Sequence, residues 1–334
     1  MDLFKRAGLI GLELDTGEAR AVELCGSARA PVLAACGRVP LPDDAVVEGA
    51  VVRPESVADA LEELWTSAGI TGREVVLGVA NQGVLVRFAT FPKVPADKMA
   101  RMIRYQAQDY LPMPLSSVVL DYMVIGEIAD ERGEFLEVLL VAARRDMLDN
   151  FLAALSMARL KPRDIDVSSL ALLRVLPVEA QAGTAALVNV ANGLSNILVV
   201  AEGVPRMARL IPVGLKDAAK LLDCSLGEVV PDPGTDAQRG WPREALLAWI
   251  DSLTAEISSS IGYYNAQPGT AAVERIVLSG RGARVEGLSA LVRESIGVPV
   301  TTMQPLEGKN WRTRNGGDIA RQAPDFAISL GLVR

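Results

Sequence analysis

The most informative feature of this 334-residue sequence is an absence, because it contains no histidine. Without an imidazole group the chain cannot build a Ser-His-Asp triad, a Cys-His pair, a histidine proton shuttle or a histidine-ligated metal site. Much of the hydrolase and metalloenzyme repertoire is therefore excluded before any other pattern is considered.

Cysteine and long apolar runs are also scarce. The three cysteines are Cys25, Cys36 and Cys224, and they contain no C-x-x-C pair. They therefore indicate neither a disulfide framework nor a Cys₄ zinc site, and a reducing compartment is the simplest interpretation. No window reaches the ~18 consecutive apolar residues of a membrane span, and the first residues lack the apolar region of a signal peptide. We expect a cytoplasmic protein that meets a membrane only through partners.

Positive charge is in deficit, since Lys plus Arg number 34 against 41 for Asp plus Glu, a net charge of −7. Such a surface binds nucleic acid poorly, so no nucleic-acid partner is expected. Hydrophobic residues make up 50% of the chain, which is enough for a full core. At about 150 residues per domain, the length predicts two domains.

Both halves of the chain open with the same pattern of strand, short polar turn and strand. In the first half, alternating residues at 9–14 and 19–24 flank a glycine-bearing turn, a signal of a β-hairpin. In the second half, 186–190 and 196–200 flank another such turn. A repeat of this length indicates two related domains rather than a solenoid.

A third glycine-bearing turn comes late in the chain. It reads Gly280-Arg281-Gly282, follows a strand of the buried type at 276–279 and precedes a predicted helix. Backbone N–H groups at tight turns and helix N-termini can cradle phosphate oxygens, and glycine permits a close approach. Each turn alone is typical of a plain connector, but the three together form a more specific set.

This set resembles the actin-like ATPase superfamily, in which two hairpins clamp the phosphates of a nucleotide and a late glycine turn meets the adenosine. Within the superfamily, residues 3–334 resemble the family of type IV pilus assembly proteins PilM, relatives of the cell-division protein FtsA. The stretches that carry this resemblance lie outside the turns, at 91–95 (FPKVP), 103–115 (IRYQAQDYLPMPL), 119–122 (VLDY), 140–144 (LVAAR), 166–174 (DVSSLALLR) and 326–332 (FAISLGL).

The resemblance implies an α/β, actin-like two-domain fold with duplicated ribonuclease-H-like cores and an inserted FtsA/PilM-type subdomain. The first domain would cover residues 1–180 and contain the insertion at about 75–150. The second domain would cover 181–334 and contain a smaller subdomain at about 216–270.

ATP and Mg²⁺ are the cofactors that the resemblance implies, but all three turns depart from the family pattern. The first hairpin of the family reads Asp-Ile-Gly-Ser-Ser-Ser-x-Lys, and here Asp15 and Glu18 replace a glycine and a serine. A carboxylate beside a triphosphate is repulsive unless Mg²⁺ lies between them. Asn189 replaces an aspartate of the second hairpin, and Arg281 separates the glycines of the third turn. These changes argue against ATP hydrolysis and against an enzyme, while nucleotide binding stays open. The candidate nucleotide contacts are Thr16, Gly17, Arg20, Asn189, Gly193, Ser195, Gly280 and Gly282, and the candidate metal ligand is Glu13.

The inserted subdomain provides the candidate partner site. In PilM-like proteins a groove beside it takes the short cytoplasmic tail of PilN, a single-span membrane protein. Such a groove needs an apolar lining with a few polar groups, because an extended peptide presents backbone groups and alternate side chains. Tyr110 and Leu111, at the end of a predicted helix, are also typical of core positions. The candidate partner residues are Arg87, Arg104, Tyr105, Tyr110, Leu111 and Pro112.

The function implied by the resemblance is a cytoplasmic assembly adaptor at the inner membrane, which couples a PilN-like tail to components of the pilus motor. Two alternatives stay open: an active ATPase or sugar kinase of the same superfamily, and the equivalent adaptor of a type II secretion or competence system. Assembly into homo-oligomers is a further open question.

Overall fold

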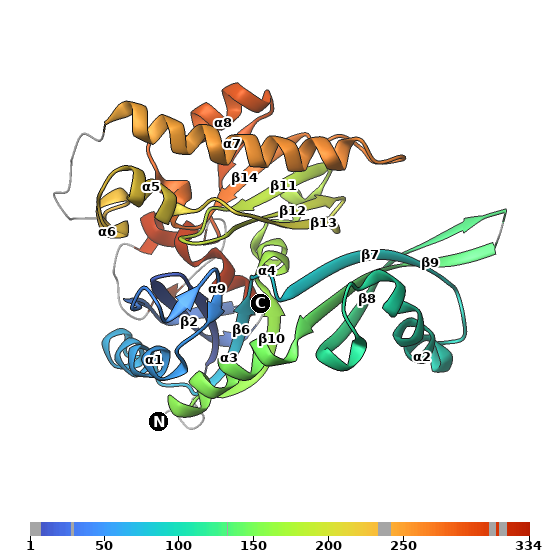
Figure 1. The fold of residues 1–334 in the computed structure, drawn as a ribbon, viewed down its shortest axis with the longest axis horizontal. Coiled ribbons are helices and arrows are strands. Elements are labelled where there is room, and N and C mark those ends of the chain that lie inside the picture. The colour runs from blue at the N-terminus through green and yellow to red at the C-terminus, as the bar shows by residue number, and fades with distance from the viewer. Residues whose placement is uncertain (1–7, 28–29, 132, 233–241, 307–311, 314–318) are drawn as a thin grey trace.

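The computed structural model shown in Figure 1 describes residues 8–27, 30–131, 133–232, 242–306, 312–313 and 319–334. It has two α/β units, one above the other in the view of Figure 1, and a three-stranded insertion that extends to one side. No helix within the described ranges is both long enough and apolar enough to cross a membrane.

The first unit is built on a six-stranded sheet with the strand order β10-β6-β1-β2-β3-β16. Strand β1 is antiparallel to β2 and parallel to β6. It is buried almost throughout, because helices cover both faces of the sheet. The strands are β1 (Leu9–Asp15), β2 (Glu18–Ser27), β3 (Ala30–Pro40), β6 (Glu74–Val79), β10 (Lys161–Val167) and β16 (Arg312–Thr313).

One face of this sheet is covered by α1 (Pro54–Ala68) and α3 (Arg145–Met157). Helix α1 begins with proline and ends at Gly69 in the left-handed conformation, with φ of 65°. This arrangement follows the preference for proline at helix starts and glycine just beyond helix ends. Leu61 and Leu64 of α1 pack with Phe151 of α3 in the core below the sheet.

The second unit repeats the topology of the first. Its sheet has the order β13-β12-β11-β14-β15, in which an antiparallel three-strand meander is followed by two parallel strands, as in β3-β2-β1-β6-β10 of the first unit. Its strands are β11 (Thr184–Asn189), β12 (Ser195–Ala201), β13 (Val204–Ile211), β14 (Arg275–Ser279) and β15 (Val300–Thr302). Its helices are α5 (Leu215–Leu221), α6 (Leu226–Val229), α7 (Arg243–Asn265) and α8 (Leu288–Ile296).

Two short helices join the units through a shared core. Helices α4 (Ser168–Val175) and α9 (Ala327–Leu332) pack between the two sheets, against Val76 of β6 and Leu187 of β11 among others. The units therefore share apolar contacts as well as the polar contacts described below. The shorter elements are β4 (Val46–Val47), β5 (Ala50–Val51) and the 3₁₀ helices η3 (Val178–Gln181), η4 (Arg281–Arg284) and η5 (Ile319–Phe326).

The insertion has an antiparallel sheet of its own, with the order β7-β9-β8 and α2 on one face. The sheet spans residues 84–144, inside the predicted range of 75–150; β6 before it and α3 after it belong to the first unit. Ile103 of α2 packs on Phe91 and Leu136 in a small separate core. The elements are β7 (Val84–Pro92), α2 (Ala96–Gln106), η1 (Ala107–Tyr110), η2 (Leu115–Ser117), β8 (Val118–Asp130) and β9 (Gly133–Arg144).

The third turn differs from the sequence prediction. Strand β14 leads through Gly280, at φ of 78°, into the 3₁₀ helix η4, and the α-helix α8 begins only at Leu288. Because Gly287 also has a positive φ, of 82°, the chain turns twice before α8 can start. No α-helix therefore directly follows this turn.

Candidate functional site

The three turns meet between the two units, and their glycines allow them to touch one another. A Cβ atom at Gly193 would lie 2.3 Å from Thr16 Oγ1, so the first two hairpins are in direct contact. A Cβ atom at Gly282 would lie 2.2 Å from Val190 Cγ1. Glycine in these turns therefore serves a close approach between segments of the chain.

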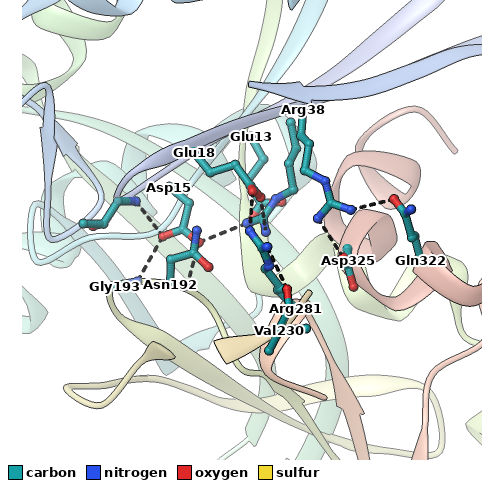
Figure 2. A network of polar contacts seen from close by, with 12 residues as sticks. Glu13, Asp15, Glu18, Arg38, Asn192, Gly193, Val230, Arg281, Gln322 and Asp325 are labelled. Carbon is teal, nitrogen blue, oxygen red and sulfur yellow. Dashed lines mark hydrogen bonds and ion pairs between the residues drawn. The ribbon is translucent and has the colours of Figure 1, made fainter. Parts of the chain in front are cut away.

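A buried ionic cluster fills the first hairpin. Arg20 is 1% exposed, and its Nη2 atom lies 3.0 Å from Glu13 Oε1 and 3.0 Å from Asp15 Oδ2. Its Nη1 atom lies 3.3 Å from Glu18 Oε1. In the hairpin register Glu13 is opposite Arg20 and Asp15 is opposite Glu18, so the pairing follows from the two-residue turn between the strands. Figure 2 shows this cluster from close by.

Asp15 extends the cluster to the second unit. Its Oδ2 atom accepts a hydrogen bond of 2.8 Å from the backbone N–H of Asn192, and its Oδ1 atom accepts one of 3.3 Å from Gly193 N–H. The Thr16 N–H donates to Oδ1 at 2.7 Å. One carboxylate thus accepts hydrogen bonds from backbone amides of both hairpins, as Figure 2 shows for Asn192 and Gly193.

Arg281 makes a second ionic connection between the units. Its Nη1 atom lies 2.8 Å from Glu18 Oε2, and its Nη2 donates at 2.8 Å to the Val230 carbonyl. Beside it, the carboxylate of Asp325 accepts from Arg38 at 3.0 Å and from Arg284 at 2.8 Å. Arg281, Glu18, Arg20 and Asp15 thus form a chain of ion pairs in this part of the contact.

Burial changes the pKa values within this cluster. It raises the pKa of Glu13 to about 7, because the attraction of Arg20 only partly offsets the loss of solvent. Burial alone would lower the pKa of Arg20, but Glu13, Glu18 and Asp15 outweigh it and raise that pKa. Burial lowers the pKa of Arg281 despite its contact with Glu18.

The predicted nucleotide contacts therefore lie close together, and several of them contact other parts of the chain, while Thr16 Oγ1 and Asn189 Nδ2 are buried with no hydrogen-bond partner among the described residues. Asn189 and Gly280 are adjacent, since a Cβ atom at Gly280 would lie 2.6 Å from Asn189 Oδ1. Ser195 Oγ donates to the Val213 carbonyl at 2.6 Å. A Cβ atom at Gly17 would lie 3.3 Å from Leu226 Cδ1. Thr16, Arg20, Gly193 and Gly282 belong to the contacts described above.

Residues in this cleft do not fit a magnesium triphosphate. The cavity bordered by Glu13, Asp15 and Asn189 measures about 10 Å³, which is room for about one water molecule, whereas ligand pockets measure about 300–1,000 Å³. Amides that could hold a phosphate donate to Asp15, and Glu13, the candidate metal ligand, is paired with Arg20. Within the described ranges, no group of three or more acidic or cysteine side chains is arranged to hold a metal ion.

A second hollow lies beside the insertion, and we call it the lateral groove. It measures about 490 Å³ and is bordered by β8, β9, α4 and the turn between β12 and β13. Its lining is mainly apolar, and the polar side chains in it include Asp121 and Asp166, the latter paired with Arg174. The residues that line it include Tyr122, Met123, Val124, Leu139, Val141, Leu170, Leu173 and Pro205.

The predicted partner residues lie elsewhere on the insertion. Leu139 and Val141 line the lateral groove, whereas their neighbours Val138 and Leu140 pack toward α2, so the groove and α2 are on opposite faces of the sheet. Arg104 and Tyr105 are exposed on α2, and Tyr105 is 85% exposed.

The other partner residues are divided between several surroundings. The Tyr110 ring meets the Phe91 ring edge-on at 5.5 Å, and Leu111 is buried with Val118. Pro112 is exposed next to Leu111. Arg87 borders a smaller cavity of about 300 Å³ between β7 and the second unit. The structure thus does not bring these six residues together at one groove.

The sequence prediction missed the lateral groove, although β8 carried a signal for it. Residues 118–125 of this strand read VVLDYMVI, so apolar residues face both sides of the sheet. Such a run is typical of a strand that is covered on both faces. In the structure one face carries α2, while Met123 on the other is 47% exposed at the groove.

Comparison with known proteins identifies relatives over nearly the whole chain. The model of a family described as type IV pilus assembly protein PilM matches residues 11–222 and 230–333. A solved structure described as the PilM-PilN type IV pilus biogenesis complex has 26% identity and a TM-score of 0.84, and the match covers 98% of each chain.

More distant structures share the fold alone. The ethanolamine utilization protein EutJ from Carboxydothermus hydrogenoformans has 13% identity and a TM-score of 0.56, with 97% of this chain and 88% of that chain covered. MreB5 of Spiroplasma citri, bound to AMPPNP, has 10% identity and a TM-score of 0.53, with 98% and 95% covered. These likenesses and the duplicated topology confirm the predicted actin-like fold.

Proposed function

The chain belongs to the family of type IV pilus assembly proteins PilM, and on that premise we propose that it is a pilus assembly adaptor that binds the cytoplasmic tail of a PilN-like membrane protein. The observation that carries this proposal is the likeness, over 98% of both chains, to a chain in a PilM-PilN complex. Under this proposal, the chain acts at the inner membrane through its partner, and it couples that partner to the pilus motor.

The lateral groove is the site we assign to the tail. Extended peptides bind where apolar side chains find pockets and backbone groups find a strand edge. Strand β8 is an outer strand of its sheet, and Met123 and Val124 on it are 47% and 39% exposed. The groove therefore offers an apolar lining next to a strand edge, with the ion pair of Asp166 and Arg174 on its border.

The opposite face of the insertion, at α2, is the alternative surface. It carries Arg104 and Tyr105, which the sequence prediction placed at the partner site, but Leu111 of the same set is already buried against Val118. We favour the lateral groove because its cavity of about 490 Å³ can take several side chains of a peptide.

An ATPase or a sugar kinase is the weaker functional alternative. Both need room for phosphates between the hairpins, and the cavity beside Asp15 measures about 10 Å³. The equivalent adaptor of another secretion system is also less favoured, because the matching family is named for the type IV pilus.

Calorimetric titration with a synthetic tail peptide tests the proposal. The peptide has the sequence of the cytoplasmic tail of a PilN-like protein from the same organism. We expect saturable binding, and Met123→Glu should weaken it by about tenfold or more, because it brings a charge into an apolar groove. Ile128→Glu is the matched control, since Ile128 lies on the same strand, is 42% exposed and does not border the groove.

The α2 surface is tested in the same titration. The double variant Arg104→Glu with Tyr105→Ala should bind the peptide as the wild type does. If this variant loses binding while Met123→Glu retains it, the tail lies on the α2 face. If no peptide binds the wild-type protein, the adaptor proposal itself fails.

A further inference from the structure

Asp15 is held as proteins hold a bound anion. Its carboxylate accepts hydrogen bonds from three backbone N–H groups, those of Thr16, Asn192 and Gly193. Its Oδ2 atom also lies 3.0 Å from Arg20 Nη2. The side chain is 8% exposed, so few water molecules can replace these hydrogen bonds. These four donors come from both units of the molecule.

Such a set of donors is not specific to carboxylates. Successive backbone N–H groups in a turn form a concave surface that attracts anions, and phosphate oxygens accept the same hydrogen bonds as carboxylate oxygens. The Asn192 and Gly193 amides are adjacent in the second hairpin, and Thr16 N–H of the first hairpin donates to the same oxygen, Oδ1, as Gly193 N–H, while Asn192 N–H donates to Oδ2. Asp15 therefore fills an anion site that the two hairpins form together.

The surrounding cluster places positive charge beside this site. Glu13, Asp15 and Glu18 face two guanidiniums, Arg20 and Arg281. Asp15 is the carboxylate that reaches across to the amides of the second unit. Without it, the amides of Asn192 and Gly193 would lack this acceptor.

We propose that Asp15 is a built-in substitute for the phosphate of a ligand, which joins the two units without a nucleotide, and that a latent phosphate site lies beneath its side chain. The inference goes beyond the proposed function and holds whether or not a tail peptide binds at the lateral groove. Free phosphate and the phosphates of a nucleotide share the chemistry of this site.

The variant Asp15→Gly tests the proposal, because it removes the carboxylate and leaves the amides and Arg20 in place. Purified wild-type and variant proteins are titrated calorimetrically with inorganic phosphate, pyrophosphate and ADP, each in a separate experiment. We expect Asp15→Gly to bind at least one of them about tenfold more tightly than the wild type. Equal gains for pyrophosphate and ADP assign the site to phosphate alone, and a larger gain for ADP assigns it to a nucleotide.

Two further variants make this experiment specific. Asp15→Asn keeps the volume of the side chain and should gain no phosphate affinity, because the space stays filled. Asp164→Gly repeats the substitution at an exposed position of β10, where the carboxylate accepts a hydrogen bond from the neighbouring Ile165 N–H, and should bind as the wild type does.

The proposal is overturned if folded Asp15→Gly gains no affinity for any of the three ligands. It is also overturned if the wild type already binds phosphate, pyrophosphate or ADP as tightly as the variant. If Asp15→Gly does not fold, the test uses the wild-type protein alone, and its melting temperature is measured with and without each ligand. We expect no change, and a rise in the melting temperature would contradict the proposal.

Discussion

The cleft between the two units and the lateral groove beside the insertion differ in the side chains that line them and in the size of their cavities. The cleft is filled by the charged side chains of Glu13, Asp15, Glu18, Arg20 and Arg281 and keeps a cavity of about 10 Å³. The lateral groove is mainly apolar and measures about 490 Å³. The cleft is thus occupied by side chains of the chain itself, while a peptide-sized hollow is open elsewhere. A shared fold does not imply a shared ligand, since function depends on the individual site.

The largest effect is expected from removing the central cation of the cleft. Arg20→Met leaves three buried carboxylates without their shared partner, and such a loss costs about 3–5 kcal/mol of unfolding free energy. Urea denaturation measures it. Arg53→Met is the control, because Arg53 pairs with Asp44 at an exposed site where a pair contributes at most about 1 kcal/mol. Equal losses for both variants would mean that the cluster does not hold the cleft together.

A smaller effect should appear in the pH dependence of stability. The pKa of Glu13 is raised from 4.5 to about 7, so the folded state binds a proton that the unfolded state releases between these values. The stability that this group contributes is full below pH 4.5 and is lost as the pH rises through about 7, a fall of about 3 kcal/mol.

Glu13→Gln sharpens this test because its side chain cannot ionise. Urea denaturation across this pH range should show the wild type falling relative to Glu13→Gln. Glu62→Gln, at an exposed position of α1, should follow the wild-type profile. Parallel profiles of Glu13→Gln and the wild type would contradict the buried, proton-binding role of Glu13.

The smallest effect is expected where the insertion meets the second unit. Arg206 Nη1 lies 3.0 Å from Glu137 Oε1, but both side chains are about one-third exposed, so Arg206→Ala should cost about 1 kcal/mol or less. The same denaturation experiment measures it. A loss as large as that of Arg20→Met would place the main ionic connection between the parts of the molecule here and not in the cleft.

Much of the fold could be predicted from sequence because its signals are local. Alternating residues around short turns predicted both hairpins, which the structure has at β1–β2 and β11–β12. The two-residue turn after Asp15 also fixes Glu13 opposite Arg20, so this pair was readable from the hairpin alone.

The rest depends on contacts between distant segments. The hydrogen bond that the Asn192 amide donates to Asp15 joins residues 177 positions apart in the sequence, and it forms only because the two units approach closely. The lateral groove forms because α4 and the β12–β13 turn lie opposite the insertion, which no local pattern encodes. The sequence therefore indicated that Asp15 was unsuited to a triphosphate, but not what its carboxylate binds instead.

The most direct test of the account is titration of the wild-type protein with the tail peptide, in the presence and absence of saturating magnesium ATP. If the tail binds at the lateral groove and the cleft is closed by Asp15 and Arg281, the dissociation constant should be the same in both conditions. No binding of the peptide, or an affinity that changes about tenfold with magnesium ATP, would contradict the account.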